Sequence, residues 1–377
     1  MKLLSLFANI GVAEAYLAKI GVPVVLANEL IPRRAQLYSK IYPETEMICG
    51  DITDQGVLDQ IISRAQSLGV DAIMATPPCQ GISRAGKQIL NDERNLLFMP
   101  VLDIIDAIQP NYVFMENVPQ FLEAEVIVGN ETKRIIDVIN DRLADAYEIT
   151  TNLIDTKNYS VPQTRQRAIL LMTKKDRGLV VWTVPAHDEK LVSLEEAIGH
   201  LPSLDPFVKD ITDEERQDMF PDYQAKVNEA QTVSPWHKPP VHIKRQVITM
   251  MHTPTGKTAF DNEKYKPTKA DGSLVTGYKS TYRRLRWCDP ASTVTMDNRK
   301  ISSQNNVHPG RFLGNDSNGD VLYSDARALT LFELMRVMSL PDWWPLPLDT
   351  DEAFVRSIIG EGIPPLFVKK VFENIKQ

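Results

Sequence analysis

Cysteine, histidine and long apolar runs are all scarce in this 377-residue chain. Its three cysteines, Cys49, Cys79 and Cys288, are far apart and form no Cys-x-x-Cys pair, which argues against a disulfide framework or a cysteine zinc site. The six histidines, among them His237 and His242, lack ligand-like spacing with acidic or thiol partners, so we expect no metal. No apolar run is long enough to span a membrane, and the N-terminus lacks a small-residue cleavage site. We therefore expect a cytoplasmic protein that does not bind membranes.

Basic residues are fewer than acidic residues in the whole chain, but they are concentrated in one region. The net charge is −7, yet residues 238–300 contain 13 Lys and Arg against 5 Asp and Glu. An acidic body with a basic face is typical of a protein that binds a polyanion. A solvated basic loop is the alternative explanation, and we favour nucleic acid.

Short apolar runs alternate with helical patterns over the first 175 residues. Strands are predicted in KLLSLFA, VPVVLANE, EMICGDI, VDAIMAT and NYVFMEN, and helices over residues 12–20 and around 94–108. Because the runs are apolar on both faces, we expect a doubly wound α/β sheet of parallel strands covered by helices. Ligands bind beyond the carboxyl ends of the strands in such sheets.

Two features near the first strands are typical of a nucleotide site. Gly11 permits a tight turn after the first strand. Glu29, at the end of the second strand, stands where an acid binds the hydroxyls of a nucleotide ribose.

Three reactive groups follow the later strands. Cys79 lies in a loop that two prolines stiffen, and Glu116 ends the strand NYVFMEN. Arg165 and Arg167 lie at the mouth of another strand, where a spacing of two residues places both on one face. A thiol, a carboxylate and a guanidinium therefore converge on one edge of the sheet. A lone cysteine can also be a small buried hydrophobe, so it is the convergence that indicates chemistry.

This combination suits group transfer to a pyrimidine. C5 of cytosine is too weak a nucleophile to attack a methyl donor, but addition of a thiolate at C6 makes it reactive. Cys79 would supply the thiolate, Glu116 the acid at N3 and Arg165 the cation at O2. Because C6 is hidden in a stacked duplex, the base would have to be flipped out first.

The same residues lie in motifs that resemble the DNA (cytosine-5)-methyltransferase family of bacterial and phage restriction-modification systems. The motifs are FANIG, NE at 28–29, GDIT, PPCQG, ENVPQF, QTRQR, RALTLFELMRVMSLPD and GEGIPP, in the family's order. They cover the two ends of the chain, and YRRLRWCDPASTVT resembles the segment that closes the family's variable middle region. The resemblance implies a Rossmann-like S-adenosylmethionine-dependent methyltransferase sheet with a smaller, irregular target-recognition domain.

The resemblance also implies roles for single residues. Cys79 is the nucleophile, Glu116 protonates N3, Arg165 contacts O2 and Arg167 supports it. The residues implied to bind S-adenosylmethionine, with Glu29 at the ribose and Asp51 and Ile52 at the adenine, are Phe7, Ala8, Asn9, Gly11, Glu29, Asp51, Ile52, Pro78, Leu97 and Glu361.

Some of these positions are ambiguous or depart from the family. Core packing would explain Phe7, Ile52 and Leu97 by residue type alone. Asn9 and Val12 stand where the family usually has glycines. The last motif has Glu361 where asparagine is usual, and these departures affect the detailed cofactor contacts rather than the catalytic assignment.

The motif positions also predict the domain organisation. We expect a catalytic and cofactor-binding domain over residues 1–204, a target-recognition domain over residues 205–325, and C-terminal helices over residues 326–377 that complete the catalytic domain. The enzyme is expected to be a monomer that acts on double-stranded DNA in a bacterial or phage-infected cell, with a functionally paired restriction endonuclease as a candidate partner.

Specificity is expected to reside in the middle region. Lysine and arginine there would neutralise phosphates, while fewer side chains would read base edges. Arg283, Arg284 and Arg286 in YRRLRW are candidates for these contacts.

Three alternatives remain open. Methylation of a tRNA cytosine would use the same fold, but the Cys-Phe-Thr signature of those enzymes is missing. A catalytically dead DNA-binding regulator would have no need of Cys79, Glu116 and Arg165 together. A nicotinamide dehydrogenase would explain the strand, glycine turn and downstream acid, but it leaves PPCQ unexplained and the first loop lacks Gly-x-Gly-x-x-Gly.

Overall fold

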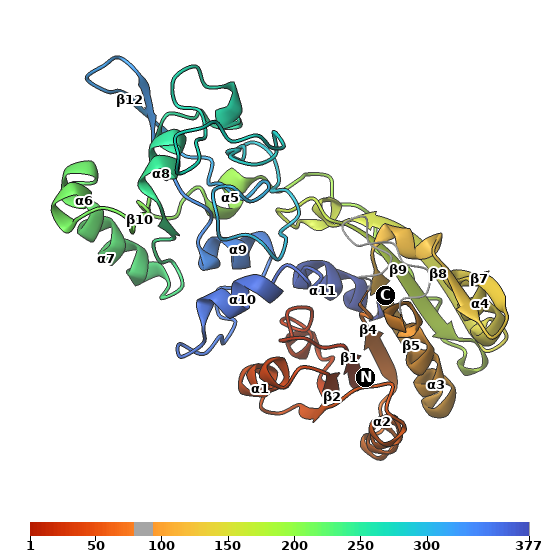
Figure 1. Cartoon of the computed structure of the whole chain (residues 1–377). Helices are drawn as coiled ribbons and strands as arrows, with labels where there is room; N and C mark the ends of the chain where they lie inside the picture. The colour runs from red at the N-terminus through yellow and green to blue at the C-terminus, as the bar shows by residue number, and fades with distance from the viewer. Residues whose placement is uncertain (79–92, 377) are drawn as a thin grey trace.

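A seven-stranded sheet forms the centre of the computed structural model, which describes residues 1–78 and 93–376 (Figure 1). Its strands follow the order β3-β2-β1-β4-β5-β9-β8. Each pairs in parallel with its neighbours except β9, which is antiparallel to β5 and β8. The bounds are β1 Leu3–Leu6, β2 Val24–Glu29, β3 Glu46–Cys49, β4 Ala72–Ala75, β5 Tyr112–Asn117, β8 Tyr147–Asp155 and β9 Gln166–Lys174. The prediction of a doubly wound, mostly parallel α/β sheet is confirmed.

The strands are apolar on both sides because each side packs against a different core. Side chains alternate along a strand, so Leu4 and Ile73 face one core while Leu3 and Met74 face the other. The first core contains α2, α3 and α4, and the second contains α11 from the far end of the chain (Figure 1). The bounds are α1 Pro32–Ile41, α2 Gln55–Leu68, α3 Phe98–Ile108, α4 Ile135–Leu143 and α11 Pro365–Glu373.

Two local predictions differ from the structure. Residues 12–20 were expected to be helical, but they form turns that end in the short 3-10 helix η1 Ala18–Ile20. Residues 12–15 are all buried in succession, and exposure begins only at Ala18 and Lys19, so burial does not follow the helical spacing that an amphipathic helix would show. The strand β8 was not predicted. Only Tyr147 and Ile154 of its nine residues are fully buried, which leaves little apolar pattern to recognise.

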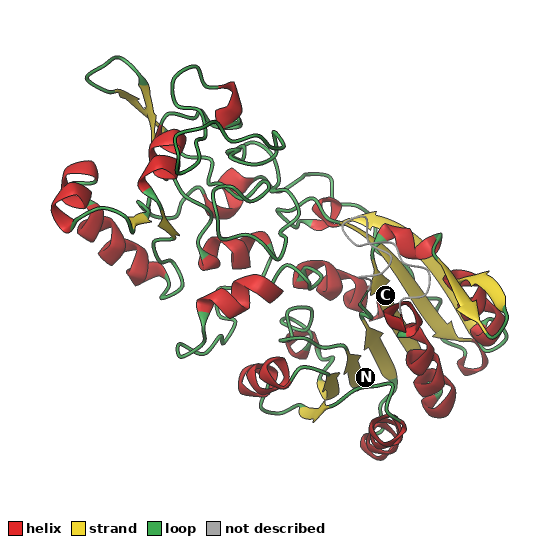
Figure 2. Ribbon diagram, viewed as in Figure 1, coloured by secondary structure: helices red, strands yellow, loops and turns green. Residues whose placement is uncertain are grey.

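Residues beyond the sheet are mostly irregular and form a second lobe (Figure 2). A separate hydrophobic cluster, which includes Val247, Met250, Ile301 and Val307, forms its interior. Its elements and those that follow are α5 Leu194–Ile198, β10 Phe207–Val208, α6 Asp213–Met219, α7 Tyr223–Val233, β11 Val241–His242, α8 Lys244–Met251, β12 Phe312–Asn315, β13 Val321–Tyr323, α9 Leu331–Val337 and α10 Glu352–Ile358. A hairpin of β6 Glu125–Val128 and β7 Glu131–Arg134 lies before α4.

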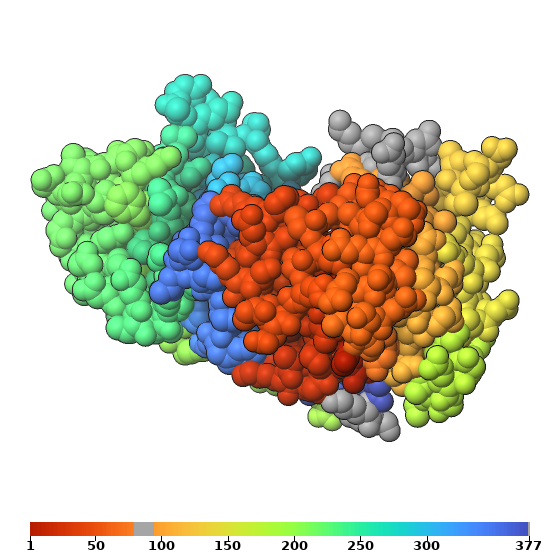
Figure 3. All heavy atoms as spheres, turned by 90° about the horizontal axis from the view of Figure 1, so that it is seen from below, coloured from red at the N-terminus to blue at the C-terminus, as the bar shows by residue number. Residues whose placement is uncertain are grey.

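The C-terminal residues lie between the two lobes. In the space-filling view they separate the N-terminal residues from the region drawn in green and cyan (Figure 3). α9 and α10 bury their apolar faces in a cluster that also contains Ile10 and Val12 of the first lobe and Leu285 of the second. The last helices therefore connect both parts of the molecule.

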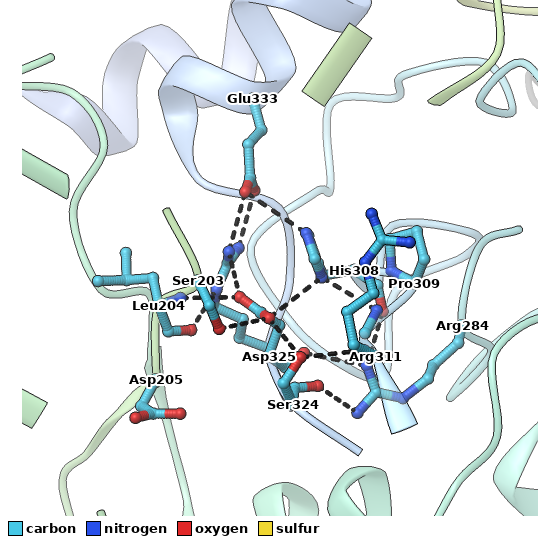
Figure 4. Close-up of polar contacts among 12 residues, drawn as sticks. Ser203, Leu204, Asp205, Arg284, His308, Pro309, Arg311, Ser324, Asp325 and Glu333 are labelled. Atoms are coloured by element: carbon cyan, nitrogen blue, oxygen red, sulfur yellow. Dashed lines mark hydrogen bonds and ion pairs between the residues drawn. The ribbon is translucent and has the colours of Figure 1, made fainter. Parts of the chain in front are cut away.

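A buried polar network fastens the two ends of the second lobe (Figure 4). Asp325 accepts a hydrogen bond from the backbone N–H of Leu204 at 2.9 Å, and Arg327 Nε donates to the carbonyl of Leu204 at 2.7 Å. The remaining nitrogens of Arg327 reach Asp325 at 2.8 Å and both oxygens of Glu333 at 2.7 and 2.9 Å. The network therefore joins Leu204, where the chain enters the second lobe, to residues 325–333, where it leaves that lobe.

Two further properties concern only the described part of the chain. None of its helices has the length and apolar character that a membrane span requires. Within residues 1–78 and 93–376, no group of three or more His, Cys, Asp or Glu side chains is arranged to hold a metal ion.

Candidate functional site

The predicted site residues follow the carboxyl ends of neighbouring strands. The sheet order changes direction between β1 and β4, which is where ligands bind in open α/β sheets. Phe7 follows β1 and Thr76 follows β4, and Thr76 Oγ1 donates to the carbonyl of Phe7 at 3.3 Å. Asn117, at the end of β5, donates from Nδ2 to the carbonyl of Pro77 at 3.0 Å. The three loops are therefore joined at this switch point. Cys79 lies outside the described residues.

The first loop, residues 7–11, has an unusual backbone. Phe7, Asn9 and Gly11 have φ angles of 59°, 51° and 80°, in the left-handed region that favours glycine. A side chain at Gly11 would also place its Cβ 2.1 Å from the ring of Tyr42. Such backbone conformations persist only where surrounding contacts hold them, and they are common at binding sites.

Glu29 supplies one of those contacts. Its buried carboxylate accepts hydrogen bonds from the backbone N–H of Asn9 and of Ile31, both at 2.9 Å. The predicted ribose-binding residue is thus at the base of the first loop. Leu30 and Ile31, which follow it, are exposed apolar residues. In the sequence, the only sign of this surface is that two apolar residues follow Glu29 directly.

The other predicted cofactor residues have varied surroundings. Asp51 is exposed, and its Oδ1 accepts from the backbone N–H and hydroxyl of Thr53. Ile52 is buried in the core under the sheet, and Leu97 is half-buried at the start of α3. Pro78 is half-buried beside the switch point. Ile52 therefore has the core contacts that its residue type alone suggested.

Glu116 and Arg167 form a close ion pair at the ends of β5 and β9. Arg167 Nε lies 2.6 Å from Glu116 Oε1, and both side chains are largely buried. The strand register explains the pair. Glu116 is opposite Ile169 in the antiparallel ladder, so Arg167 is its diagonal neighbour on the same face.

Arg165 contacts a different part of the molecule. Its guanidinium donates to the backbone carbonyls of Gly360 at 2.7 Å, of Glu361 at 3.3 Å and of Val294 at 3.3 Å. Since β5 ends at Asn117, no residue of that strand lies opposite Arg165. The two arginines were expected to act from one face, and the structure instead gives them separate partners.

The two departures at Asn9 and Glu361 are in contact. Asn9 Nδ2 donates to Glu361 Oε2 at 3.1 Å, and Arg34 binds the same carboxylate. Arg34 was not predicted as a site residue. Sequence reasoning had no signal for it, because 327 positions separate it from Glu361.

The expected DNA contacts in YRRLRW need one correction. Arg284 is fully buried, and its guanidinium donates to the backbone carbonyls of Met250, His308 and Ser324 among others. It cannot contact DNA, so that prediction is wrong. Arg283 and Arg286 are exposed and stay candidates.

Comparisons with known proteins agree with this architecture. The family described as C-5 cytosine-specific DNA methylase matches residues 1–377. Type II methyltransferase M1.HgaI of Avibacterium volantium is 41% identical over 99% of this chain and 97% of its own length. Type II methyltransferase M.DdeI of Desulfomicrobium norvegicum is 26% identical over 100% of this chain and 88% of its own length.

A solved structure supports the fold. A Spodoptera frugiperda DNMT2 variant superposes with a TM-score of 0.59 at 15% identity, over 100% of this chain and 99% of that protein. At this identity the likeness concerns the fold alone.

Proposed function

Because the chain belongs to the family of C-5 cytosine-specific DNA methylases, we propose that it methylates C5 of a cytosine in a specific duplex DNA sequence by base flipping and covalent addition of Cys79. The contact between Glu116 and Arg167 carries the proposal. It puts a carboxyl and a guanidinium together, largely buried, at the carboxyl end of β5, next to the switch point where the sheet predicts a ligand.

The proposed chemistry begins with the thiolate of Cys79. A bond forms between its sulfur and C6 of the flipped cytosine, while the ring electrons shift so that C5 becomes nucleophilic. Once C5 has taken the methyl group, for which S-adenosylmethionine would be converted to S-adenosylhomocysteine, a water molecule accepts the C5 proton and Glu116 takes back the proton at N3. The carbon–sulfur bond then breaks, which releases the Cys79 thiolate and restores the aromatic ring. Cys79 is then free for another turnover.

Glu116 and Arg167 would serve the ring during that addition. Glu116 shares a proton with N3, which accepts the electron density that the thiolate adds. We assign the cation near O2 to Arg167 rather than to Arg165, since Arg167 already contacts Glu116. Arg165 would instead be a structural residue, because its guanidinium is bound to backbone carbonyls of the C-terminal segment.

The first loop has features that fit S-adenosylmethionine. Asn9 Oδ1 is a buried acceptor with no hydrogen-bond partner among the described residues, and it could accept from an ammonium group. Gly11 lets the loop approach closely, and Leu30 and Ile31 offer exposed apolar surface beside Glu29. S-adenosylmethionine, bound here with Glu29 at its ribose, would supply the methyl group.

Residues 205–325 are proposed as the target-recognition domain, between a catalytic domain over 1–204 and the completing helices of 326–377. The basic surplus of this region supports phosphate contacts, whose contribution to affinity falls steeply with salt. The relatives are named type II methyltransferases, which supports the same class for this chain. We further propose that it acts as a cytoplasmic monomer within a restriction-modification system, paired with an endonuclease.

Sequencing of methylated DNA tests the proposed function. Duplex DNA from cells that express the chain should contain 5-methylcytosine at one recurrent sequence, as read by bisulfite or nanopore sequencing. Purified protein should transfer labelled methyl groups to the same duplex and not to tRNA in a parallel reaction. Labelled tRNA with unlabelled DNA would overturn the assignment in favour of an RNA substrate.

A further inference from the structure

Three side chains far apart in the sequence link the first loop to the C-terminal segment. Arg34 binds Glu361 through two contacts, from Nη1 to Oε2 at 2.8 Å and from Nη2 to Oε1 at 3.0 Å. Asn9 Nδ2 donates to Glu361 Oε2 at 3.1 Å. Both oxygens of Glu361 are thus occupied by the protein itself. We call Arg34, Glu361 and Asn9 the latch.

The latch acts on a loop that needs support. Asn9 has a φ of 51°, which costs free energy for any residue other than glycine. Its backbone N–H is held by Glu29 and its side chain by Glu361. If the contact with Glu361 is lost, other conformations of the loop become accessible.

The carboxylate of Glu361 is itself held in place. Arg165 donates to the backbone carbonyls of Gly360 and Glu361. A Cβ at Gly360 would lie 2.8 Å from the carbonyl oxygen of Val294, so the segment packs directly on a neighbouring backbone. The segment therefore offers Asn9 a fixed partner.

We propose that Glu361, anchored by Arg34, is a positioning residue that holds the first loop, through Asn9, in its cofactor-binding conformation. This inference rests on the proposed use of S-adenosylmethionine. It differs from the expectation that Glu361 contacts the cofactor itself. If only a fraction of the protein molecules has the first loop in its cofactor-binding conformation, the apparent dissociation constant for the cofactor rises in inverse proportion to that fraction.

A second ion pair on α1 provides a matched control. Arg33, next to Arg34, binds Asp351 at 2.9 Å, but both side chains are more than half exposed, and the pair joins α1 to residue 351 rather than to the first loop. Exposed pairs of this kind contribute little to stability. Arg33→Gln changes the same helix and also removes one ion pair to the C-terminal region.

Calorimetric titration with S-adenosylhomocysteine tests the latch without turnover. Glu361→Ala should raise the dissociation constant about tenfold, the scale of one hydrogen bond to a charged group. Arg33→Gln should leave it within about twofold. In an Asn9→Gly background, which removes the side chain without straining the backbone, Glu361→Ala should have little further effect, because the two residues act through one contact.

The outcomes separate the latch from the proposed function. A wild-type protein that does not bind S-adenosylhomocysteine would overturn both proposals. If the wild type binds and Glu361→Ala binds equally well, only the latch is overturned, and additive effects of Asn9→Gly and Glu361→Ala would also refute it. Should Glu361→Ala fail to fold, Glu361→Met, which keeps the side-chain length but has no oxygen acceptor for Asn9, decides in its place: weakened binding in a folded protein supports the latch, and unchanged binding refutes it.

Discussion

Removal of the Arg327 side chain should cost more stability than removal of any exposed ion pair. The guanidinium is fully buried and donates to Leu204, Asp325 and Glu333. Arg327→Met keeps much of the apolar volume but leaves two buried carboxylates without their cation. Breaking one buried pair costs about 3–5 kcal/mol, so we expect a loss of about 4 kcal/mol or more. That is a large part of a typical stability of about 5–15 kcal/mol.

In the wild-type protein the charges of this network should not change near neutrality. Burial alone would raise the pKa of Asp325, but the charges of His308 and Arg327 lower it, and Arg327 likewise overcomes the effect of burial and lowers the pKa of Glu333. A lowered carboxyl pKa gives stability that is present above the ordinary pKa and lost only as the pH falls through the folded value. Burial lowers the pKa of His308 to about 4, so this histidine is neutral between pH 7 and 8. The network therefore keeps the same charges throughout that window.

Urea denaturation followed by tryptophan fluorescence measures the loss at pH 7.5. Lys40→Met, which removes an exposed pair with Asp349, is the control and should cost at most about 1 kcal/mol. In an Arg327→Met background, Glu333→Gln should restore stability, because it neutralises a carboxylate that has lost its partner. A loss below about 1 kcal/mol for Arg327→Met, or a further loss on adding Glu333→Gln, would refute this reasoning.

Two other predictions follow from single side chains. Arg167→Met should lower kcat about 100-fold with little change in melting temperature, because Arg167 contacts Glu116. Arg165→Met should mainly lower the melting temperature, because the guanidinium of Arg165 donates hydrogen bonds to buried carbonyls. The reverse pattern in kinetics and thermal unfolding would contradict this assignment. Burial raises the pKa of Glu14 from its ordinary value of 4.5 to about 7, although a hydrogen bond from Ser5 opposes this shift. The protonated Glu14 therefore stabilises the fold fully below about pH 4.5, and this contribution is lost as the pH rises through about 7. Glu14→Gln should therefore flatten the stability curve between pH 5 and 8, and an unchanged slope in urea titrations across that range would rule this out.

Most strands of the sheet could be predicted from the sequence because each is a short apolar run that adjacent residues alone identify. β2 and β5 are continuous apolar runs that end in an acidic residue or an amide, and they lie within the predicted segments. The prediction of a helix over residues 12–20 was wrong: residues 12–15 are buried in succession without helical spacing, and the apolar pattern of the sequence alone cannot distinguish that case.

The candidate site was predictable only in part. The motifs give the position of Glu116 next to the switch point, but they do not say which arginine contacts it. The choice depends on where β5 ends. Arg167 lies diagonally opposite Glu116 on the paired strand, whereas Arg165 lies beyond the end of β5 and binds backbone carbonyls near the C-terminus. Arg284 is a second example. Its positive charge led us to predict an exposed side chain that contacts DNA, but the side chain is fully buried, and the sequence does not show this.

Covalent trapping on 5-fluorocytosine tests the central claim most directly. With S-adenosylmethionine present, duplex DNA that carries this base throughout one strand should form a denaturation-resistant adduct with the wild-type protein, because fluorine cannot leave as a proton does. Cys288→Ser, which changes an exposed cysteine, should still form the adduct. Cys79→Ser should not, because a hydroxyl is far less ionised and less nucleophilic than a thiol. An adduct of equal yield in Cys79→Ser, or one mapped by mass spectrometry to another residue, would contradict the account.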